Sequence, residues 1–330
     1  MDKTVSIALC TYNGEKYLRE QIDSILNQTY PIFEIVVQDD GSTDNTMVIL
    51  NEYQKRFPNL FHIFIHEQEK RGNINHNFFS CGSKTHGEII AFSDQDDIWR
   101  PDKIESLVNT INNNDVCFNL TYYTSSPIDF NGLPSIGTVP NFGLPRLLFM
   151  GGMIHGHAMI VKRTFFELVL QKLPDAFICS APLYFDTILA GIALSTNSIV
   201  HINEYLTLHR VHGLSVTTGA KKKSFLERSA KNFLIQVFRP LLPSIHKTAK
   251  QKLEKRLKAF HEMFQYFPPT INTIQANGII EAFFSKFKII SCSVQLVKCR
   301  DEIFYRKEPH SLVAIIRACF FQLTVLNYYC

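Results

Sequence analysis

The sequence predicts an α/β fold in which a mostly parallel sheet is flanked by helices and followed by a basic helical extension. Over the first hundred residues, apolar runs of strand length alternate with helix-length segments, a pattern typical of a parallel sheet. Three of the apolar runs end directly in polar residues. Because ligands of open α/β sheets bind beyond the carboxyl ends of the strands, these polar residues predict one shared binding edge.

The individual elements follow from the spacing of the apolar residues. Continuous apolar runs predict strands at Val5–Cys10, Phe33–Gln38, Phe61–His66 and Glu88–Ser93. Spacings of three and four predict helices at Glu15–Asn27 and Asp44–Phe57, with Asp44 as the N-cap of the second, and a further helix that begins within Asn75–Cys81.

The pattern changes after residue 115, which divides the chain into segments 1–115, 116–220 and 221–330. Asn119–Ser126 and Asn203–His209 resemble strands, and Pro182–Leu194 has helical spacing. Pro127–Pro145 is rich in Gly, Pro and Asn, which favours a loop. From Lys221 onward we expect amphipathic helices with Lys and Arg on one face.

Charge is distributed unevenly along the 330 residues. Residues 221–330 contain 19 Lys and Arg against 7 Asp and Glu, whereas residues 1–220 contain 15 against 23. A basic segment with interleaved Phe residues suits an anionic membrane surface. The alternative is a solvated helical face that packs on the body of the protein. Nucleic-acid binding is not favoured, because no recognition motif accompanies the charge.

Cysteine usage and hydropathy favour a cytoplasmic protein. None of the 8 Cys residues has the CxxC spacing of a zinc or redox site, and the first residues lack the apolar stretch of a signal peptide. The charged residue Arg317 interrupts the most apolar run, Ser311–Cys330, so no spanning helix is predicted.

The acidic run Asp94-Gln95-Asp96-Asp97 is the feature most indicative of chemistry. Ionised carboxylates this close repel one another unless they are paired or bound to a cation. A hard divalent cation resolves the conflict and also stabilises a diphosphate leaving group. The alternative is a solvated acidic turn before the helix that starts near Pro101.

Three segments together resemble glycosyltransferase family 2, the inverting enzymes with the nucleotide-diphospho-sugar-binding fold called GT-A. They are Ser6–Asn13, Gln38–Asp44 and Ala91–Trp99, and the last resembles the form found in rhamnosyltransferase-like members. The resemblance implies a nucleotide-sugar-binding half at 1–115, an acceptor-binding half at 116–220 and the basic helical tail at 221–330.

The resemblance also implies roles for individual residues. Asp39 or Asp40 would hydrogen-bond the base, with Asp39 favoured by motif position, and Asp96 would hold Mn²⁺ or Mg²⁺. Asp97 would sit in or beside that metal shell, on the acceptor side with Trp99. The remaining residues of the donor site would be Thr11, Tyr12, Asn13, Asp94, Arg71 and Asn77. For Arg71 and Asn77, an ordinary surface position is an equal alternative.

Later segments resemble the family's acceptor side. His155 and His157 would line the acceptor site, unless they are buried structural histidines. Asp186 takes the position of the base, although Phe185 and Thr187 replace the flanking His and Trp of related enzymes. Asp175 is the fallback for the base, and Asp186 as a helix-capping residue is the alternative.

The segment His209–Val216 resembles the one that supplies a late His to the metal or diphosphate. His212 fits this role best, and Arg210 would pair with the diphosphate. An imidazole among carboxylates suits Mn²⁺ better than Mg²⁺.

The sequence therefore predicts a metal-dependent, inverting, non-processive glycosyltransferase. Its donor would be a nucleotide-diphosphate sugar such as dTDP-rhamnose or a UDP-sugar, and its acceptor a glycan or lipid-linked hydroxyl in cell-surface polysaccharide or O-antigen assembly. It would act in the cytoplasm, or peripherally on the inner face of the plasma membrane. The alternatives are a sugar-phosphate nucleotidyltransferase, which would need a Gly-rich phosphate loop after the first strand, and a non-catalytic nucleotide-sugar-binding module.

Overall fold

A computed structural model describes residues 3–66, 72–125, 129–137, 139, 142–149, 154–212, 243–285 and 288–300. The strands are β1 Val5–Thr11, β2 Glu34–Asp39, β3 Phe61–Ile65, β4 Ile89–Ser93, β5 Ile98–Trp99, β6 Val116–Thr124, β7 Met159–Lys162 and β8 Ile199–Arg210. The α-helices are α1 Leu18–Leu26, α2 Thr46–Arg56, α3 Ile74–Ser83, α4 Lys103–Ile111, α5 Leu144–Phe149, α6 Arg163–Lys172, α7 Asp175–Ser180, α8 Phe185–Ser195, α10 Pro243–Gln265, α11 Ile271–Phe284 and α12 Lys288–Lys298.

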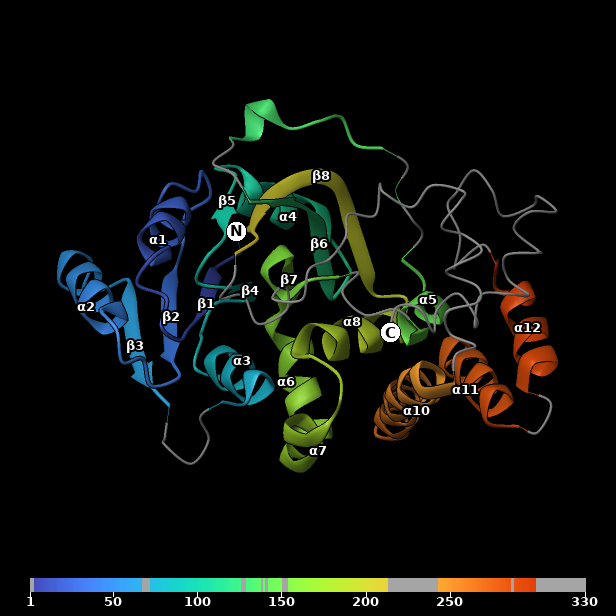
Figure 1. Cartoon of the computed structure of the whole chain (residues 1–330). Coiled ribbons are helices and arrows are strands. Elements are labelled where there is room, and N and C mark those ends of the chain that lie inside the picture. Colours follow the sequence, from blue (N-terminus) through green and yellow to red (C-terminus); the bar gives the residue numbers. More distant parts are fainter. Residues whose placement is uncertain are drawn as a thin grey trace.

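The strands form one 8-stranded sheet in the order β3-β2-β1-β4-β7-β6-β8-β5 (Figure 1). β1 pairs in parallel with β2 and β4, β2 with β3, and β6 with β8. β7 is antiparallel to both β4 and β6, and β5 is antiparallel to β8. The predicted mostly parallel sheet flanked by helices is therefore confirmed. Of the helical extension predicted at 221–330, the described residues form α10 to α12, and 221–242 and 301–330 lie outside the described residues.

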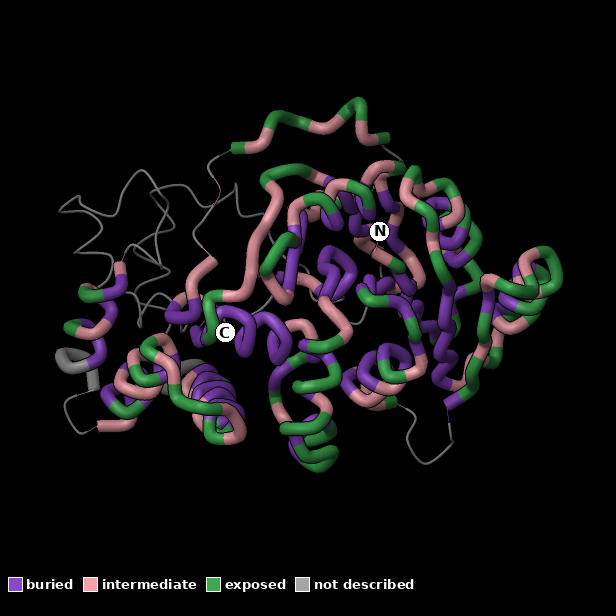
Figure 2. Tube along the Cα trace, turned by 180° about the vertical axis from the view of Figure 1, so that it is seen from behind, coloured by how far each residue is buried: buried purple, intermediate pink, exposed green. Residues whose placement is uncertain are grey.

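Strands β1, β2 and β4 are buried on both faces, which explains why they are nearly continuous apolar runs. The core consists of two clusters, one on each face of the sheet. In β1, Ala8 and Cys10 point into the first cluster, while Ile7 and Leu9 point into the second. Helices α1, α2 and α4 contribute to the second cluster, and α3, α6 and α8 to the first. Figure 2 shows the buried strands and α8 enclosed by exposed helix faces and loops.

Helix α10 packs against the body of the protein through an apolar face, as an amphipathic helix should. Leu253, Leu257 and Phe260 are buried in the first core cluster. Arg256 is 7% exposed and donates from its guanidinium to the carbonyls of Leu147 (2.7 Å) and Leu148 (3.0 Å) in α5. The lysines at 252, 255 and 258 lie on the exposed face.

The structure corrects two local predictions. The N-cap of α2 is Asn45, and Asp44 stands one residue earlier, where its Oδ1 accepts a hydrogen bond from the Thr46 N–H (3.0 Å). The predicted loop 127–145 contains a short 3₁₀ turn at Phe130–Gly132, and α5 begins at Leu144, because leucines at 144, 147 and 148 have helical spacing and are buried. The segment boundaries after residues 115 and 220 stay predictions.

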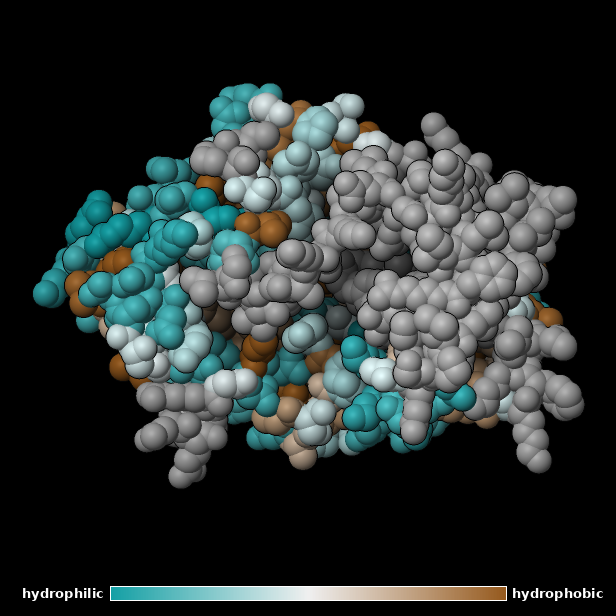
Figure 3. All heavy atoms as spheres, in the orientation of Figure 1, coloured by the Kyte–Doolittle hydropathy of each residue, from teal (hydrophilic) through white to brown (hydrophobic). Residues whose placement is uncertain are grey.

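The surface over α1 and α2, at the left of Figure 3, is largely hydrophilic with scattered hydrophobic residues. Within the described part of the chain, no helix combines the length and the apolar character needed to cross a membrane.

Candidate active site

The polar ends of β1, β2 and β4 meet at one edge of the sheet, as the sequence predicts. The register places Thr11 opposite Asp39, and the Thr11 Oγ1 donates to Asp39 Oδ1 (2.8 Å). Gln95, in the acidic run after β4, exchanges two hydrogen bonds with the backbone of Tyr12, with lengths of 2.8 and 2.9 Å. These contacts hold the three strand ends together.

Asp39 is 1% exposed and organises the turn that follows β2. Its Oδ2 accepts from the backbone N–H groups of Gly41 (2.9 Å) and Ser42 (2.8 Å), and its Oδ1 also accepts from Ser42 Oγ (2.6 Å). Gly41 adopts a φ of 87°, which favours glycine. Asn13 joins the β1 loop to the same turn, since its Oδ1 accepts from the Thr43 N–H (2.8 Å).

Asp40 lies beside Asp39 but is held by different partners. Its Oδ2 accepts from the backbone N–H of Gly72 (2.8 Å), and its Oδ1 lies 3.0 Å from His66 Nδ1. His66 Nε2 lies 2.7 Å from His76 Nδ1. Neither His66 nor His76 was a predicted site residue. His66 nevertheless follows β3 at the sheet edge where the other polar strand ends lie, and ligands of such sheets bind there.

Asp97 is the most deeply buried member of the acidic run, at 0% exposure. Its Oδ1 lies 2.7 Å from His209 Nδ1, and its Oδ2 lies 3.2 Å from His157 Nδ1. Burial alone would raise the pKa of Asp97, but the charge of His157 and the hydrogen bond from His209 lower it to about 2. Burial would lower the pKa of His209, but Asp97 raises it to about 9.

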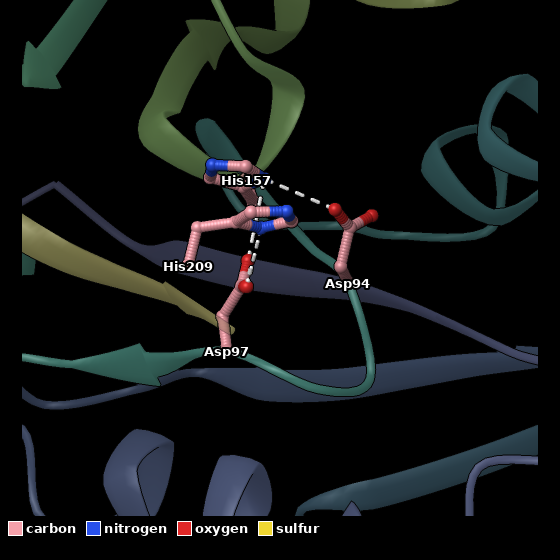
Figure 4. A group of neighbouring side chains, drawn as sticks. All are labelled: Asp94, Asp97, His157 and His209. Atoms are coloured by element: carbon pink, nitrogen blue, oxygen red, sulfur yellow. Dashed lines mark hydrogen bonds and ion pairs between the residues drawn. The ribbon is translucent and has the colours of Figure 1, made fainter. Parts of the chain in front are cut away.

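Asp94 completes a group of four side chains with Asp97, His157 and His209 (Figure 4). One ligand atom from each lies within 4.8 Å of the others, and Asp94 Oδ2 is 3.0 Å from His157 Nδ1. The rings of His157 and His209 are stacked, with centroids 4.9 Å apart and planes 12° apart. Figure 4 shows both rings directly above the Asp97 carboxylate.

Asp96 pairs with the predicted second metal ligand. Its Oδ2 lies 2.8 Å from His212 Nε2, and both side chains are 14% exposed. Burial raises the pKa of Asp96 to about 6, and the charges of Asp97 and Asp94 act in the same direction. Arg210 lies nearby, since its Nε donates to the Asp96 carbonyl (3.3 Å). The structure thus brings Asp96, His212 and Arg210 together.

Asp186 lies in the first turn of α8, next to the segment that carries His155 and His157. Its Oδ2 accepts from the Gly156 N–H (3.2 Å) and its Oδ1 from the Thr187 N–H (2.6 Å). A Cβ at Gly156 would lie 2.1 Å from Phe185 Cζ, so only glycine admits this close packing. Burial raises the pKa of Asp186 to about 6, although both backbone hydrogen bonds oppose this shift.

His155 continues the imidazole stack toward the surface. Its ring centroid lies 5.2 Å from that of His157, and its Nε2 lies 2.5 Å from the hydroxyl of Tyr123, which is 42% exposed. Asp175, the fallback for the base, is exposed at the start of α7.

Other predicted site residues are placed elsewhere or are not described. Trp99 is 2% exposed and packs in the second core cluster, where Lys103 Nζ lies 3.5 Å from its ring centre, so it presents no surface to an acceptor. Asn77 is 6% exposed in α3, and its Oδ1 has no hydrogen-bond partner among the described residues. Arg71 lies outside the described residues, and Tyr12 is 55% exposed beside the acidic run.

Lys103, whose side chain is buried beside this site, was not a predicted site residue. Lys103 is 1% exposed and donates from Nζ to the His157 carbonyl (2.5 Å). Burial lowers the pKa of Lys103 well below its ordinary value, while the charges of Asp97 and Asp94 oppose that shift. In the sequence, Lys103 is the first residue of an amphipathic helix, and nothing in that local pattern indicates that its side chain is buried.

This sheet, with an acidic loop after β4 and a late histidine beside it, has the GT-A fold. A crystal structure of residues 1–349 of TarS from S. aureus has the same fold, with a TM-score of 0.54 at 15% sequence identity over 98% of this chain and 89% of that one. Residues 6–168 match the family model described as Glycosyl transferase family 2. Over this segment the chain is similar to glycosyltransferase family 2.

Curated relatives carry the same similarity. The dTDP-rhamnosyl transferase RfbG of Shigella flexneri is 37% identical over 124 residues, which cover 36% of this chain and 43% of RfbG. The uncharacterized glycosyltransferase RP339 of Rickettsia prowazekii is 28% identical over 250 residues, 71% of this chain and 74% of that protein. The alignment to RfbG thus spans less than half of that relative, and Asp186, His209 and His212 lie beyond the segment matched by the family model.

Proposed function

We propose that this protein transfers a glycosyl residue from a nucleotide-diphosphate sugar to an acceptor hydroxyl, with a divalent cation and with inversion at the anomeric carbon. The observation that carries the proposal is the crowding of Asp94, Asp96 and Asp97 at the edge where ligands of such sheets bind. Burial and like charges raise the pKa of Asp96 to about 6, and a bound cation would relieve this destabilisation of the ionised carboxylate.

Asp96 and His212 are the residues that fit a cation which also binds a diphosphate. Neighbouring ligands of a six-coordinate ion, with bonds of about 2.1 Å, lie about 3 Å apart, and Asp96 Oδ2 is 2.8 Å from His212 Nε2. Both side chains remain partly exposed, so coordination positions stay open to phosphate oxygens. When bound, Mn²⁺ or Mg²⁺ would stabilise the charge that develops on the leaving diphosphate.

The group of Asp94, Asp97, His157 and His209 fits a cation less well. Asp97 raises the pKa of His209 to about 9, so this imidazole is protonated at neutral pH, whereas a metal ligand must be neutral. Asp97 is also fully buried, which leaves no room for a phosphate oxygen beside it. We therefore assign this group to holding Asp94 and the acidic loop in place.

Asp186 is our candidate for the base that removes the acceptor proton. A general base works best when its pKa lies near the operating pH, and burial raises the pKa of Asp186 to about 6. The N–H groups of Gly156 and Thr187 fix its orientation next to His155 and His157, the proposed acceptor side. Attack by the activated hydroxyl, from the face opposite the diphosphate, inverts the anomeric centre.

Similarity to RfbG favours dTDP-rhamnose as the first donor to test. As the setting we propose cell-surface polysaccharide assembly. On the donor side we propose Thr11, Tyr12, Asn13, Asp94 and Arg210, with Asp39 or Asp40 at the base. For the exposed lysines of α10 we propose contact with an anionic membrane that carries a lipid-linked acceptor. The proposed place of action is therefore the cytoplasm, at the inner face of the plasma membrane.

A binding and turnover screen tests the function. Purified protein is titrated with dTDP-rhamnose, UDP-sugars and GDP-sugars in Mn²⁺ or in EDTA. Release of the nucleoside diphosphate is followed in the same samples. We expect at least one donor to bind about ten times more tightly with Mn²⁺ and to be hydrolysed slowly in the absence of acceptor. Equal affinity for every donor with and without the metal would refute the proposal.

A further inference from the structure

A chain of three polar side chains, Asp40, His66 and His76, stands at the β3 edge of the sheet. It joins three elements: Asp40 follows β2, His66 follows β3, and His76 lies in the first turn of α3. The contacts run from Asp40 Oδ1 to His66 Nδ1 (3.0 Å) and from His66 Nε2 to His76 Nδ1 (2.7 Å). The two imidazoles are also stacked, with ring centroids 4.7 Å apart.

The pattern of hydrogen bonds fixes the proton on His66. A carboxylate only accepts, so the proton between Asp40 and His66 resides on His66 Nδ1. In the neutral ring the other nitrogen, Nε2, is then an acceptor, and His76 Nδ1 is the donor to it. The third contact, from the Gly72 N–H to Asp40 Oδ2 (2.8 Å), holds the second oxygen of the same carboxylate. Asp40 is therefore fixed from both sides.

Asp40 keeps an acceptor capacity that Asp39 has lost. A carboxylate offers about four lone-pair positions. Asp39 accepts four hydrogen bonds, from Thr11, Gly41 and two groups of Ser42, and is 1% exposed. Asp40 receives one bond at each oxygen from the described residues, and its side chain is 11% exposed. Of the two, Asp40 is the carboxylate that a ligand can reach.

We infer that His66 and His76 are positioning residues for the donor, and that they aim Asp40 at a ring N–H of its nucleobase. This inference rests on the proposed function. An ionised carboxylate held in this way selects a base with a ring N–H donor at its pairing edge, which uracil, thymine and guanine carry and cytosine and adenine lack. The histidines do not touch the reacting atoms, so they act on donor affinity and not on the chemical step.

The test compares His66→Ala, His66→Asn and His76→Ala by calorimetric titration with dTDP, UDP and CDP in Mn²⁺. Asparagine keeps a donor where His66 has Nδ1. We expect His66→Ala to weaken dTDP or UDP binding by about tenfold and leave CDP binding unchanged. We expect His66→Asn to restore most of the affinity, His76→Ala to give an intermediate loss, and kcat at saturating donor to stay within about twofold of wild type.

His62→Ala is the matched control. His62 lies in β3, the strand that His66 follows, and its side chain is 44% exposed. The inference is overturned if folded His66→Ala and His76→Ala keep wild-type affinity and base preference, or if kcat falls in parallel with affinity. His76 is only half-buried, so its variant tests the idea even if His66→Ala does not fold. A wild-type protein that binds none of the nucleotides refutes the proposed function instead.

Discussion

Asp96 and Asp97 are adjacent in the chain, yet their pKa values shift in opposite directions. Burial raises the pKa of Asp96 to about 6, while His157 and His209 overcome burial and lower the pKa of Asp97 to about 2. The difference arises because Asp97 has two imidazoles around its carboxylate, whereas Asp96 has one and faces two like charges. Asp97 therefore stabilises the fold above the ordinary carboxylate pKa, and ionised Asp96 destabilises it.

This difference predicts a gain in stability from Asp96→Asn when no metal is present. The pKa of Asp96 is raised in the folded protein, so the folded state binds more protons and loses stability as pH rises from about 4 to about 6. Removing the charge should raise the free energy of unfolding by about 1–2 kcal/mol at pH 8 in EDTA and by much less at pH 4. Urea denaturation at both pH values checks this. Turnover with Mn²⁺ should be lost in the same variant, and a destabilised variant at pH 8 would contradict the electrostatic argument.

Asp186→Asn should separate chemistry from donor binding. Loss of a general base lowers kcat by about 10²- to 10⁴-fold, while donor affinity should be unchanged. The base must be ionised, so wild-type kcat should fall as pH drops through about 6, the pKa to which burial raises Asp186. Steady-state kinetics over pH 5–8 measure this, with the exposed Asp175→Asn as control. If Asp175→Asn loses activity and Asp186→Asn retains it, the fallback base is the right one.

At the scale of elements, the tail is joined to the catalytic body by α10. Its apolar face is buried, and the Arg256 guanidinium donates to two carbonyls at the C-terminal end of α5. On α10 the apolar residues, Phe260 among them, are thus used in packing. What remains available to an anionic surface on α10 is the exposed row of lysines.

Arg256→Met should destabilise the protein through this junction. The variant keeps the aliphatic volume but leaves the carbonyls of Leu147 and Leu148 without the guanidinium, at a cost of about 1–3 kcal/mol. Thermal or urea unfolding measures the loss. Lys255→Met, on the exposed face of the same helix, should change stability by less than about 0.5 kcal/mol. Equal effects of the two substitutions would mean that the buried hydrogen bonds contribute nothing.

At the scale of the whole molecule, an acidic first part and a basic last third are combined in one chain. The acidic part contains the proposed site, where a cation must offset the carboxylates before a diphosphate can bind. The basic part carries the exposed lysines of α10 for which we propose contact with an anionic membrane. This division of charge separates the two proposed partners of the enzyme, a soluble anionic donor with its metal and a membrane-bound acceptor.

Lys252, Lys255 and Lys258 should contribute to membrane binding if this division is functional. Each lysine near an anionic surface contributes about 1 kcal/mol at moderate salt, so replacing all three by Glu should weaken binding to vesicles of anionic lipid by more than tenfold. Co-sedimentation with anionic and with zwitterionic vesicles measures this. Wild-type protein that sediments with neither type would remove the membrane proposal and leave the catalytic one intact.

The sequence by itself determined the order of strands and helices up to Ser93, the shared edge of polar strand ends and the acidic run. These features are local, because apolar spacing decides whether a segment is a strand or a helix, and a parallel sheet brings its strand ends together. The family resemblance rested on the same segments, which is why it was found without a structure.

Only the tertiary structure decided what each carboxylate does. His157 and His209 reach Asp97 from positions 60 and 112 residues further along the chain, and His66 reaches Asp40 across 26. It also placed Trp99 in the core, although Trp99 lies only two residues after the acidic run. The physical reason is that a pKa, a free lone pair or a set of metal ligands depends on which distant side chains share a buried volume, and local spacing does not record that.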